Sequence, residues 1–256
     1  MSAIHLAGTA QAGHLELEVD LSVEPGETVA LLGPNGAGKT SLLRILTGLL
    51  PLTRGHLDLS DHAADVPDAG VFVEPHKRPI GWVPQDRLLF PHLTVKQNVG
   101  FSPRARPERV DQLLEVLDIT ELADRRPSSC SGGQAQRVAL ARAVATEPEV
   151  LLLDEPSAAL DIDSRHLIDN LLEDRGDRAT LLVTHDPVEA ATTADRIVIL
   201  ENGRVTQSGN PSEVRTRPLT RYAASLAGLN TIAARATAST ATTEDGVVVV
   251  LGEPAS

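Results

Sequence analysis

The stretch GPNGAGKT, residues 33–40, constrains the fold most, because it fits the pattern G-x-x-x-x-G-K-[ST]. The apolar run TVALLG, residues 28–33, predicts a buried strand before it, and residues 38–49 predict a helix after it. A glycine-rich turn between a strand and a helix lets backbone N–H groups approach phosphate oxygens closely. A chance glycine-rich turn is the alternative, and the two flanking elements argue against it.

Within this loop, we expect Lys39 to reach the β- and γ-phosphates of ATP and the Thr40 hydroxyl to hold Mg²⁺. The expected ATP-binding residues are Gly33, Pro34, Asn35, Gly36, Ala37, Gly38, Lys39, Thr40 and Ser41.

Three further segments place polar side chains after predicted strands. In VLLLDE, residues 150–155, Asp154 is expected in the Mg²⁺ shell, and Glu155 is expected to act on the attacking water. His185 ends the apolar run ATLLVTH and is expected at the same sheet edge. Gln85 follows the strand that is predicted to end at residues 79–84, and it is a further candidate for this site. The alternatives are two solvated carboxylates, a structural histidine and an ordinary loop glutamine.

Buried strands alternating with helices predict an α/β fold, with a P-loop NTPase core, a mostly parallel sheet and an antiparallel β edge. Aromatic residues are only 2% of the chain, so we expect a core of Leu, Val, Ile and Ala. The expected ATPase domain is 1–215. It consists of a nucleotide-binding core, 1–85 and 147–215, and a helical subdomain inserted in it, 86–146. A C-terminal tail with a partial accessory β segment follows over 216–256. The basic run PHKR, residues 75–78, is interpreted as a solvated loop rather than an oxyanion site.

A second candidate anion site lies in SSCSGGQAQRVALARA, residues 128–143. Small polar residues at Ser131, Gly132, Gly133 and Gln134 run directly into a predicted helix. Because the helical insertion carries this turn away from its own sheet edge, we expect it to bind the ATP of a second copy of the chain. The alternative is an ordinary helix cap, with Ser131 as the N-cap.

Taken together, GPNGAGKT, Gln85, SGGQ, LLLDEP, SAALD and His185 resemble, in order and spacing, the motifs of ABC-type ATPase subunits. The resemblance covers residues 1 to about 215. It implies that residues 131–134 are the signature motif, that Asp161 closes a loop crossing a dimer interface, and that Gln85 senses Mg²⁺ and links to a membrane partner. The chain departs from the family at Cys130, where Leu is usual, and at the adenine-stacking aromatic ring, for which His14 is the nearest planar candidate.

The net charge of −12 argues against nucleic-acid binding, and no heptad run separates the phosphate loop from SGGQ as in the DNA-repair members of the family. A transporter subunit is therefore favoured over a soluble ABC ATPase in DNA repair or regulation. The run PHKRPIGWVPQDRLLFPHLTVKQNVGF is similar to bacterial oxyanion importers, most of all to molybdate importer ATPases; importers of sulfate, iron or polyamines are the alternatives.

The resemblance implies integral membrane permease subunits as partners, and indirectly a periplasmic or extracellular solute-binding protein. We find no secretory signal and no apolar run long enough to span a bilayer. The expected location is cytoplasmic, peripheral on the inner face of the cell membrane through the permease.

Overall fold

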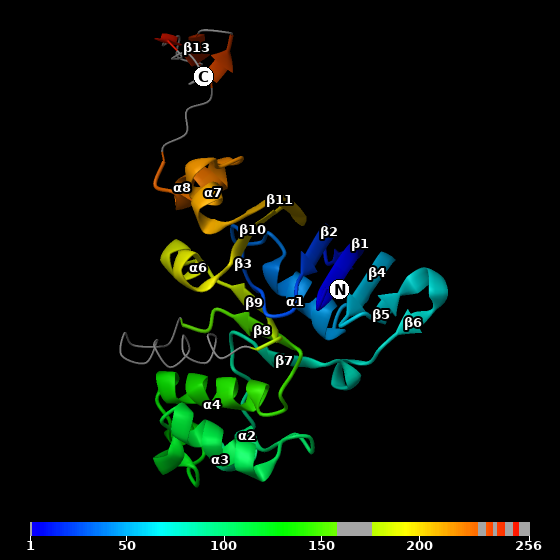
Figure 1. Cartoon of the computed structure of the whole chain (residues 1–256), viewed down its shortest axis with the longest axis vertical. Helices are drawn as coiled ribbons and strands as arrows, with labels where there is room; N and C mark the ends of the chain where they lie inside the picture. The colour runs from blue at the N-terminus through cyan, green and yellow to red at the C-terminus, as the bar shows by residue number, and fades with distance from the viewer. Residues whose placement is uncertain (1, 158–175, 230–233, 238–239, 244–247, 251–256) are drawn as a thin grey trace.

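The computed structural model describes residues 2–157, 176–229, 234–237, 240–243 and 248–250. Among these residues, the larger sheet has 11 strands in the order β6-β5-β4-β1-β2-β11-β10-β3-β9-β8-β7 (Figure 1). The strands are β1 (Ile4–Ala12), β2 (Leu15–Val23), β3 (Thr28–Leu32), β4 (Arg54–Leu59), β5 (His62–Val66), β6 (Val71–Phe72), β7 (Ile80–Val83), β8 (Val150–Asp154), β9 (Ala179–Val183), β10 (Arg196–Glu201) and β11 (Arg204–Gly209).

The sheet has a parallel part and an antiparallel part, which confirms the α/β fold. Strands β10, β3, β9, β8 and β7 pair in parallel, whereas β2, β1, β4, β5 and β6 pair antiparallel. The antiparallel part is wider than the predicted edge, because β1 pairs with both β2 and β4. No strand is predicted over β1, since its second half, GTAQA, lacks the large apolar side chains that mark a strand.

Helices connect the strands and fill the segment between β7 and β8. The described helices are α1 (Lys39–Thr47), α2 (Val95–Val99), α3 (Pro107–Val116), α4 (Gly132–Val144), α6 (Pro187–Thr193), α7 (Pro211–Thr216) and α8 (Arg221–Leu226). Helices α2, α3 and α4 lie within the predicted helical segment, and none of its described residues forms a strand. The division of the chain into domains stays a prediction.

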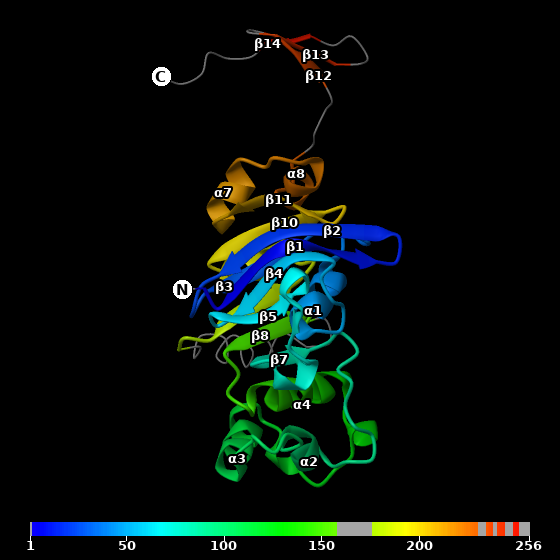
Figure 2. The same cartoon turned by 90° about the vertical axis from the view of Figure 1, so that its right-hand side faces the viewer.

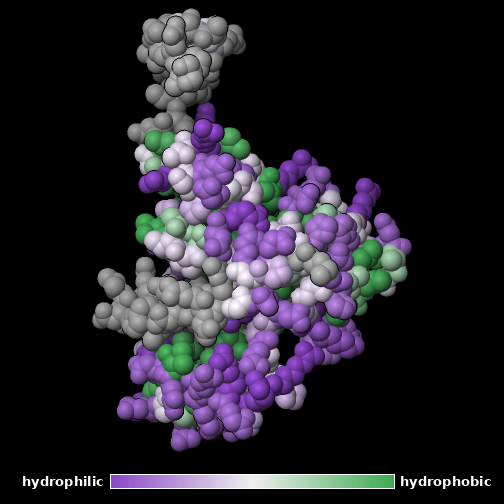
Figure 3. Space-filling model, viewed as in Figure 1, coloured by the Kyte–Doolittle hydropathy of each residue, from purple (hydrophilic) through white to green (hydrophobic). Residues whose placement is uncertain are grey.

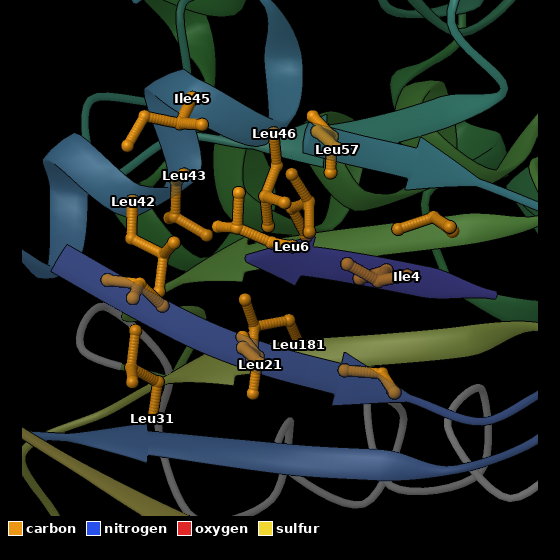
Figure 4. Packing of buried hydrophobic residues seen from close by; sticks show 14 of the residues in the cluster. Ile4, Leu6, Leu21, Leu31, Leu42, Leu43, Ile45, Leu46, Leu57 and Leu181 are labelled. Carbon is orange, nitrogen blue, oxygen red and sulfur yellow. The ribbon is translucent and has the colours of Figure 1, made fainter. Parts of the chain in front are cut away.

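The main core lies between α1 and the sheet. Figure 4 shows Leu42, Leu43 and Leu46 of α1 directed toward strand residues such as Leu6 and Leu57. Each of these side chains is fully buried, which stabilises the fold by about 1.5–3 kcal/mol per residue. This core fixes α1, and with it the glycine-rich loop, against the strands.

In the basic run at 75–78, residues 75–77 are exposed, as expected of a solvated loop, whereas Arg78 differs because it is only 3% exposed. Its Nη1 donates hydrogen bonds to the carbonyls of Ile45 and Leu46 in the last turn of α1, at 2.8 and 2.7 Å. Burial raises the pKa of the nearby Asp65 carboxyl, and the charge of Arg78 opposes that shift. Arg78 therefore pairs the Leu46 carbonyl at the end of the helix and adds a second donor to the Ile45 carbonyl, which also accepts from the Gly48 N–H.

The C-terminal segment forms a separate sheet of three short antiparallel strands (Figure 2). They are β12 (Ala234–Ala236), β13 (Thr240–Thr243) and β14 (Val248–Val250).

Figure 3 shows that hydrophilic residues cover most of one face of the molecule. Within the described residues, every helix is too short or too polar to cross a bilayer.

Candidate functional site

The glycine-rich motif lies in the loop between β3 and α1. Gly38, with φ of 106°, adopts the left-handed conformation directly before α1. A Cβ atom on Gly33 would lie 2.2 Å from the carbonyl oxygen of Leu200, so only glycine fits there. No side chain caps the first turn of α1, so its N–H groups and the positive end of its dipole remain open. The loop therefore has the geometry of an anion-binding site.

Two contacts from later parts of the chain hold this loop in place. The backbone N–H of Gly203, between β10 and β11, donates to the carbonyl of Ala37 at 2.9 Å. The Tyr222 hydroxyl on α8 accepts a hydrogen bond from the backbone N–H of Gly33, and burial raises the pKa of Tyr222. Sequence reasoning did not find Tyr222, because nothing near it in the sequence indicates a contact with a loop so far away.

Lys39 begins α1 and turns back over the loop. Its Nζ donates hydrogen bonds to the carbonyls of Gly33 at 2.7 Å and Pro34 at 3.1 Å. Burial lowers the pKa of Lys39, while the negative charges of Glu155 and Asp154 oppose that shift. The ammonium group thus lies between the loop carbonyls and two carboxylates at the end of β8.

Asp154 ends β8 as a buried acid that is 4% exposed. Burial raises the pKa of Asp154 most, and the charge of Glu155 raises it further. Lys39 and a hydrogen bond from the Thr40 hydroxyl oppose the rise. A buried carboxylate next to a second carboxylate and a hydroxyl presents the oxygen ligands that Mg²⁺ prefers. The positive charge of Lys39 only partly offsets the negative charges of the two carboxylates. These residues fit a bound Mg²⁺ ion.

The Glu155 side chain, which follows β8, contacts side chains that follow β7 and β9. Its backbone has φ of 51°, a strained value for a residue with a side chain, and its N–H donates to the Val183 carbonyl at 2.9 Å. Its Oε1 lies 3.3 Å from Nδ1 of His185, and its Oε2 accepts a long hydrogen bond of 3.4 Å from Nε2 of Gln85. Because β9, β8 and β7 are neighbours in the sheet, the three side chains follow three adjacent strands. The structure therefore brings these predicted residues together, while their roles stay predictions.

A hydrogen-bonded acid supports the two loops behind Glu155 and His185. Glu189 of α6 accepts hydrogen bonds from the hydroxyls of Ser157 and Thr184, one with each carboxylate oxygen. Ser157 follows Glu155 by two residues, and Thr184 directly precedes His185. Glu189 therefore links these two loops, and sequence reasoning did not find it because the pattern at α6 shows only an ordinary exposed helix.

The SGGQ turn forms the start of α4, away from the phosphate loop. Ser131 is the N-cap: its Oγ accepts from the N–H of Gln134 at 3.2 Å, and the Gln134 side chain accepts from the Ser131 N–H at 2.8 Å. Helix α4 contacts β7, and β9 and β8 lie between β7 and β3, the strand that leads into the phosphate loop. The helix-cap alternative is thus realised in the single chain, and binding to the ATP of a second copy stays a prediction.

A turn after Gln85 links the Glu155 region to α4. Arg87 and Leu88 are both left-handed, with φ of 62° and 45°. The Arg87 guanidinium donates to the Gly132 carbonyl at 2.9 Å, while Arg142 of α4 donates back to the carbonyls of Arg87 and Leu88, both at 2.8 Å. Sequence reasoning missed these arginines, since basic residues are common on exposed helices and loops.

Three further residues named in the sequence analysis are His14, Asp161 and Cys130. His14 is exposed in the turn between β1 and β2, and the next residue, Leu15, has its side chain beside Gly38 of the phosphate loop. Adenine contact at His14 stays a prediction. Asp161 lies outside the described residues. Cys130 is partly buried against the core around α4, and burial raises the pKa of its thiol.

Comparisons with known proteins agree with this geometry. A family model described as ABC transporter matches residues 17–158. The chain is 43% identical over 230 residues to a molybdenum import ATP-binding protein of Mycobacterium tuberculosis, covering 84% of this chain and 62% of that protein. It is 44% identical over 221 residues to a sulfate/thiosulfate import ATP-binding protein of Synechococcus elongatus, covering 82% and 62%. The chain thus spans about three-fifths of the length of these curated relatives.

Solved structures give the same result. A dimeric bacterial ABC transporter cassette matches with a TM-score of 0.68 and 30% identity, over 81% of this chain and 98% of that one. The same cassette, in a post-hydrolysis state bound to ADP and Pi, matches equally well. The ATP-binding subunit of another ABC transporter matches with a TM-score of 0.73 and 28% identity, over 85% of this chain and 93% of that one.

Proposed function

Because the chain belongs to the ABC transporter family, we propose that it is the ATP-binding and ATP-hydrolysing subunit of a bacterial importer. The observation that carries this proposal is the Glu155 carboxylate, contacted on one oxygen by Gln85 and on the other by His185. This group lies in the same charge cluster as Lys39 and Asp154. Such a cluster joins an anion-binding loop to a carboxylate that can act on water, which is what hydrolysis of a phosphoanhydride requires.

In the proposed mechanism, ATP phosphates occupy the loop from Gly33 to Ser41, and Lys39 exchanges its loop carbonyls for phosphate oxygens. Thr40, Asp154 and Gln85 would hold Mg²⁺, which neutralises charge on the phosphates when bound. Glu155 orients the attacking water and takes up its proton. His185, whose Nδ1 lies 3.3 Å from Oε1 of Glu155, hydrogen-bonds the γ-phosphate and the attacking water.

The SGGQ turn completes this site in a second copy of the chain. In a head-to-tail pair, residues 131–134 of one copy would face the phosphate loop of the other, so two identical sites form. The dimeric cassette among the structural matches supports this arrangement. ATP then joins the two copies, and hydrolysis releases them.

Integral membrane permease subunits couple this motion to transport, and a solute-binding protein delivers the solute from outside the cell. The chain itself lies on the inner face of the membrane.

We propose molybdate as the transported solute. Support comes from the run over 75–101 and from the similarity to the molybdenum import protein of M. tuberculosis. Because a sulfate/thiosulfate import protein is equally similar, the solute has to be identified by transport measurements.

The test measures uptake of molybdate, tungstate and sulfate in cells that lack this chain. We expect wild type to restore molybdate uptake, Lys39→Ala to fail, and the matched control Lys77→Ala, an exposed lysine paired with Glu74, to restore it. Restoration of sulfate uptake alone would show that the solute is wrong. Restoration of none of the three, together with ATP hydrolysis by the purified chain, would exclude these oxyanions as the solute and leave an ATPase whose permease has to be found by co-purification.

A further inference from the structure

A cluster of two histidines and one aspartate lies on strands that take no part in the ATP site. Ile4 and Leu6 of β1, and Leu57 and Leu59 of β4, are buried against the α1 side of the sheet (Figure 4). Because side chains alternate along a strand, His5 of β1 and His56 and Asp58 of β4 share the opposite side, which we call the outer face.

The register between these strands brings the three side chains together. His5 pairs directly with Asp58, and His56 lies two residues further along β4, opposite Ala7. Nδ1 of His5 lies 3.4 Å from Nε2 of His56 and 3.8 Å from Oδ2 of Asp58. The three ligand atoms all lie within 4.8 Å of one another.

The separation between the two imidazole nitrogens equals that of neighbouring ligands in a zinc site, and the carboxylate oxygen at 3.8 Å from His5 would have to move by about a few tenths of an ångström to match it. Ligand atoms about 2.1 Å from a tetrahedral Zn²⁺ ion are separated from each other by about 3.4 Å. An imidazole hydrogen bond is usually about 2.9–3.0 Å long, so the 3.4 Å contact between the histidines is long. The two rings meet edge to face with centroids 4.7 Å apart, and one nitrogen of each ring lies within 4.8 Å of a carboxylate oxygen of Asp58.

We propose that His5, His56 and Asp58 bind one divalent transition-metal ion, with Zn²⁺ as the representative species, and so join β1 to β4. Two imidazoles and one carboxylate suit zinc, nickel or copper rather than Mg²⁺ or Ca²⁺, which prefer oxygen ligands. The side chains of His5 and Asp58 are 45% and 34% exposed, so a fourth position is open to water and an ion can enter from solvent.

This site is distinct from the ATP site. Strands β1 and β4 lie in the antiparallel part of the sheet, and five strands separate β1 from β8, which carries Asp154 and leads into Glu155. The distinction matters for a test, because His185 and Glu155 also place an imidazole next to a carboxylate.

The test titrates the metal-stripped, untagged full chain with Zn²⁺ alone by calorimetry. We expect one zinc ion per chain in wild type, and affinities lower by about tenfold or more in His5→Ala, His56→Ala and the isosteric Asp58→Asn, since even loss of an outer-shell partner lowers metal affinity by about 10–100-fold. His62→Ala is the matched control: His62 lies on the adjacent strand β5 and contacts the Ser60 carbonyl instead. His185→Ala separates this site from the ATP site, and both controls should bind Zn²⁺ as wild type does.

A second measurement follows melting temperature. Zinc should raise the melting temperature of wild type and of both controls but not of His5→Ala, because binding to the folded state alone stabilises it. Equal melting temperatures of wild type and His5→Ala in a chelator would show that the variant folds. Zinc binding that survives in both His5→Ala and His56→Ala, or that is lost in His185→Ala, would overturn the proposal, as would wild type that binds no zinc.

Discussion

Replacing Glu155 by glutamine removes one negative charge while keeping the size of the side chain. The new amide can still meet Gln85, but it cannot take a proton from water. Proton transfer by a positioned side chain contributes about 10²–10⁴-fold to a rate. At 1.36 kcal/mol per tenfold change, the activation barrier should rise by about 3–5 kcal/mol.

The same charge also affects ATP binding and the fold. Glu155 raises the pKa of Asp154, so its removal relieves repulsion between the two acids and with bound phosphates. We therefore expect Glu155→Gln to bind ATP at least as tightly as wild type and to melt at an equal or higher temperature.

Steady-state phosphate release, ATP binding by calorimetry and a thermal melt measure the three effects. Glu149→Gln is the matched control, because Glu149 is an exposed acid next to the opposite end of the same strand. The reasoning is refuted if Glu155→Gln hydrolyses ATP within about threefold of wild type, since a proton-accepting role requires about 10²-fold or more. Loss of ATP binding with hydrolysis would instead assign Glu155 to binding.

Three further predictions concern neighbouring parts of the chain. Asp154→Asn should raise the free energy of unfolding at pH 7 by about 1 kcal/mol, seen as about 2–4 °C in a melt, while weakening Mg²⁺-dependent ATP binding. The pKa of Asp154 is raised above its ordinary 3.8, so wild-type stability falls as pH rises through that raised pKa, and the variant should lose this dependence. Ser131→Arg should keep ATP binding but lower hydrolysis at least about tenfold, with about 1 kcal/mol of stability lost with the helix cap; phosphate release and a melt measure this. Arg78→Leu should lower the free energy of unfolding by about 3–5 kcal/mol in urea denaturation, because carbonyls of α1 lose their donor and Asp65 loses its counter-charge.

Each of these has a contradicting result. If Asp154→Asn melted at a lower temperature than wild type at pH 7, the ionised carboxylate of Asp154 would be shown to stabilise the fold. If Ser131→Arg abolished ATP binding to the single chain, the turn would belong to its own site rather than to that of a second copy. A loss below about 1 kcal/mol in Arg78→Leu would match a solvated loop, as expected for an exposed residue; Lys77→Leu is the exposed control.

Local patterns were enough to predict the central part of the site. The glycine-rich loop and the apolar strands before Asp154 and His185 are each recognisable within about ten residues of sequence. Once parallel strands are predicted, their carboxyl ends must share an edge, and the structure places Glu155 and His185 at adjacent strand ends there.

Contacts between distant segments could not be predicted in this way. Arg78 reads as one more charge in a basic loop, and only the folded chain brings it to the carbonyl of Ile45. Tyr222 reaches Gly33 across most of the chain, and His5 meets Asp58 only through the strand register. These contacts depend on tertiary packing, which leaves no periodic signal in one sequence.

The turn after Gln85 is a short connection that hydrogen bonds hold to α4. Its two left-handed residues resist bending because leaving that conformation breaks the paired arginine bonds between Arg87, Arg142 and α4. At the other end, the 3.4 Å contact between Gln85 and Glu155 is already near the limit of a hydrogen bond. We therefore expect that a displacement of α4 by about a few tenths of an ångström, passed on through this turn, would lengthen the Gln85–Glu155 contact beyond that limit.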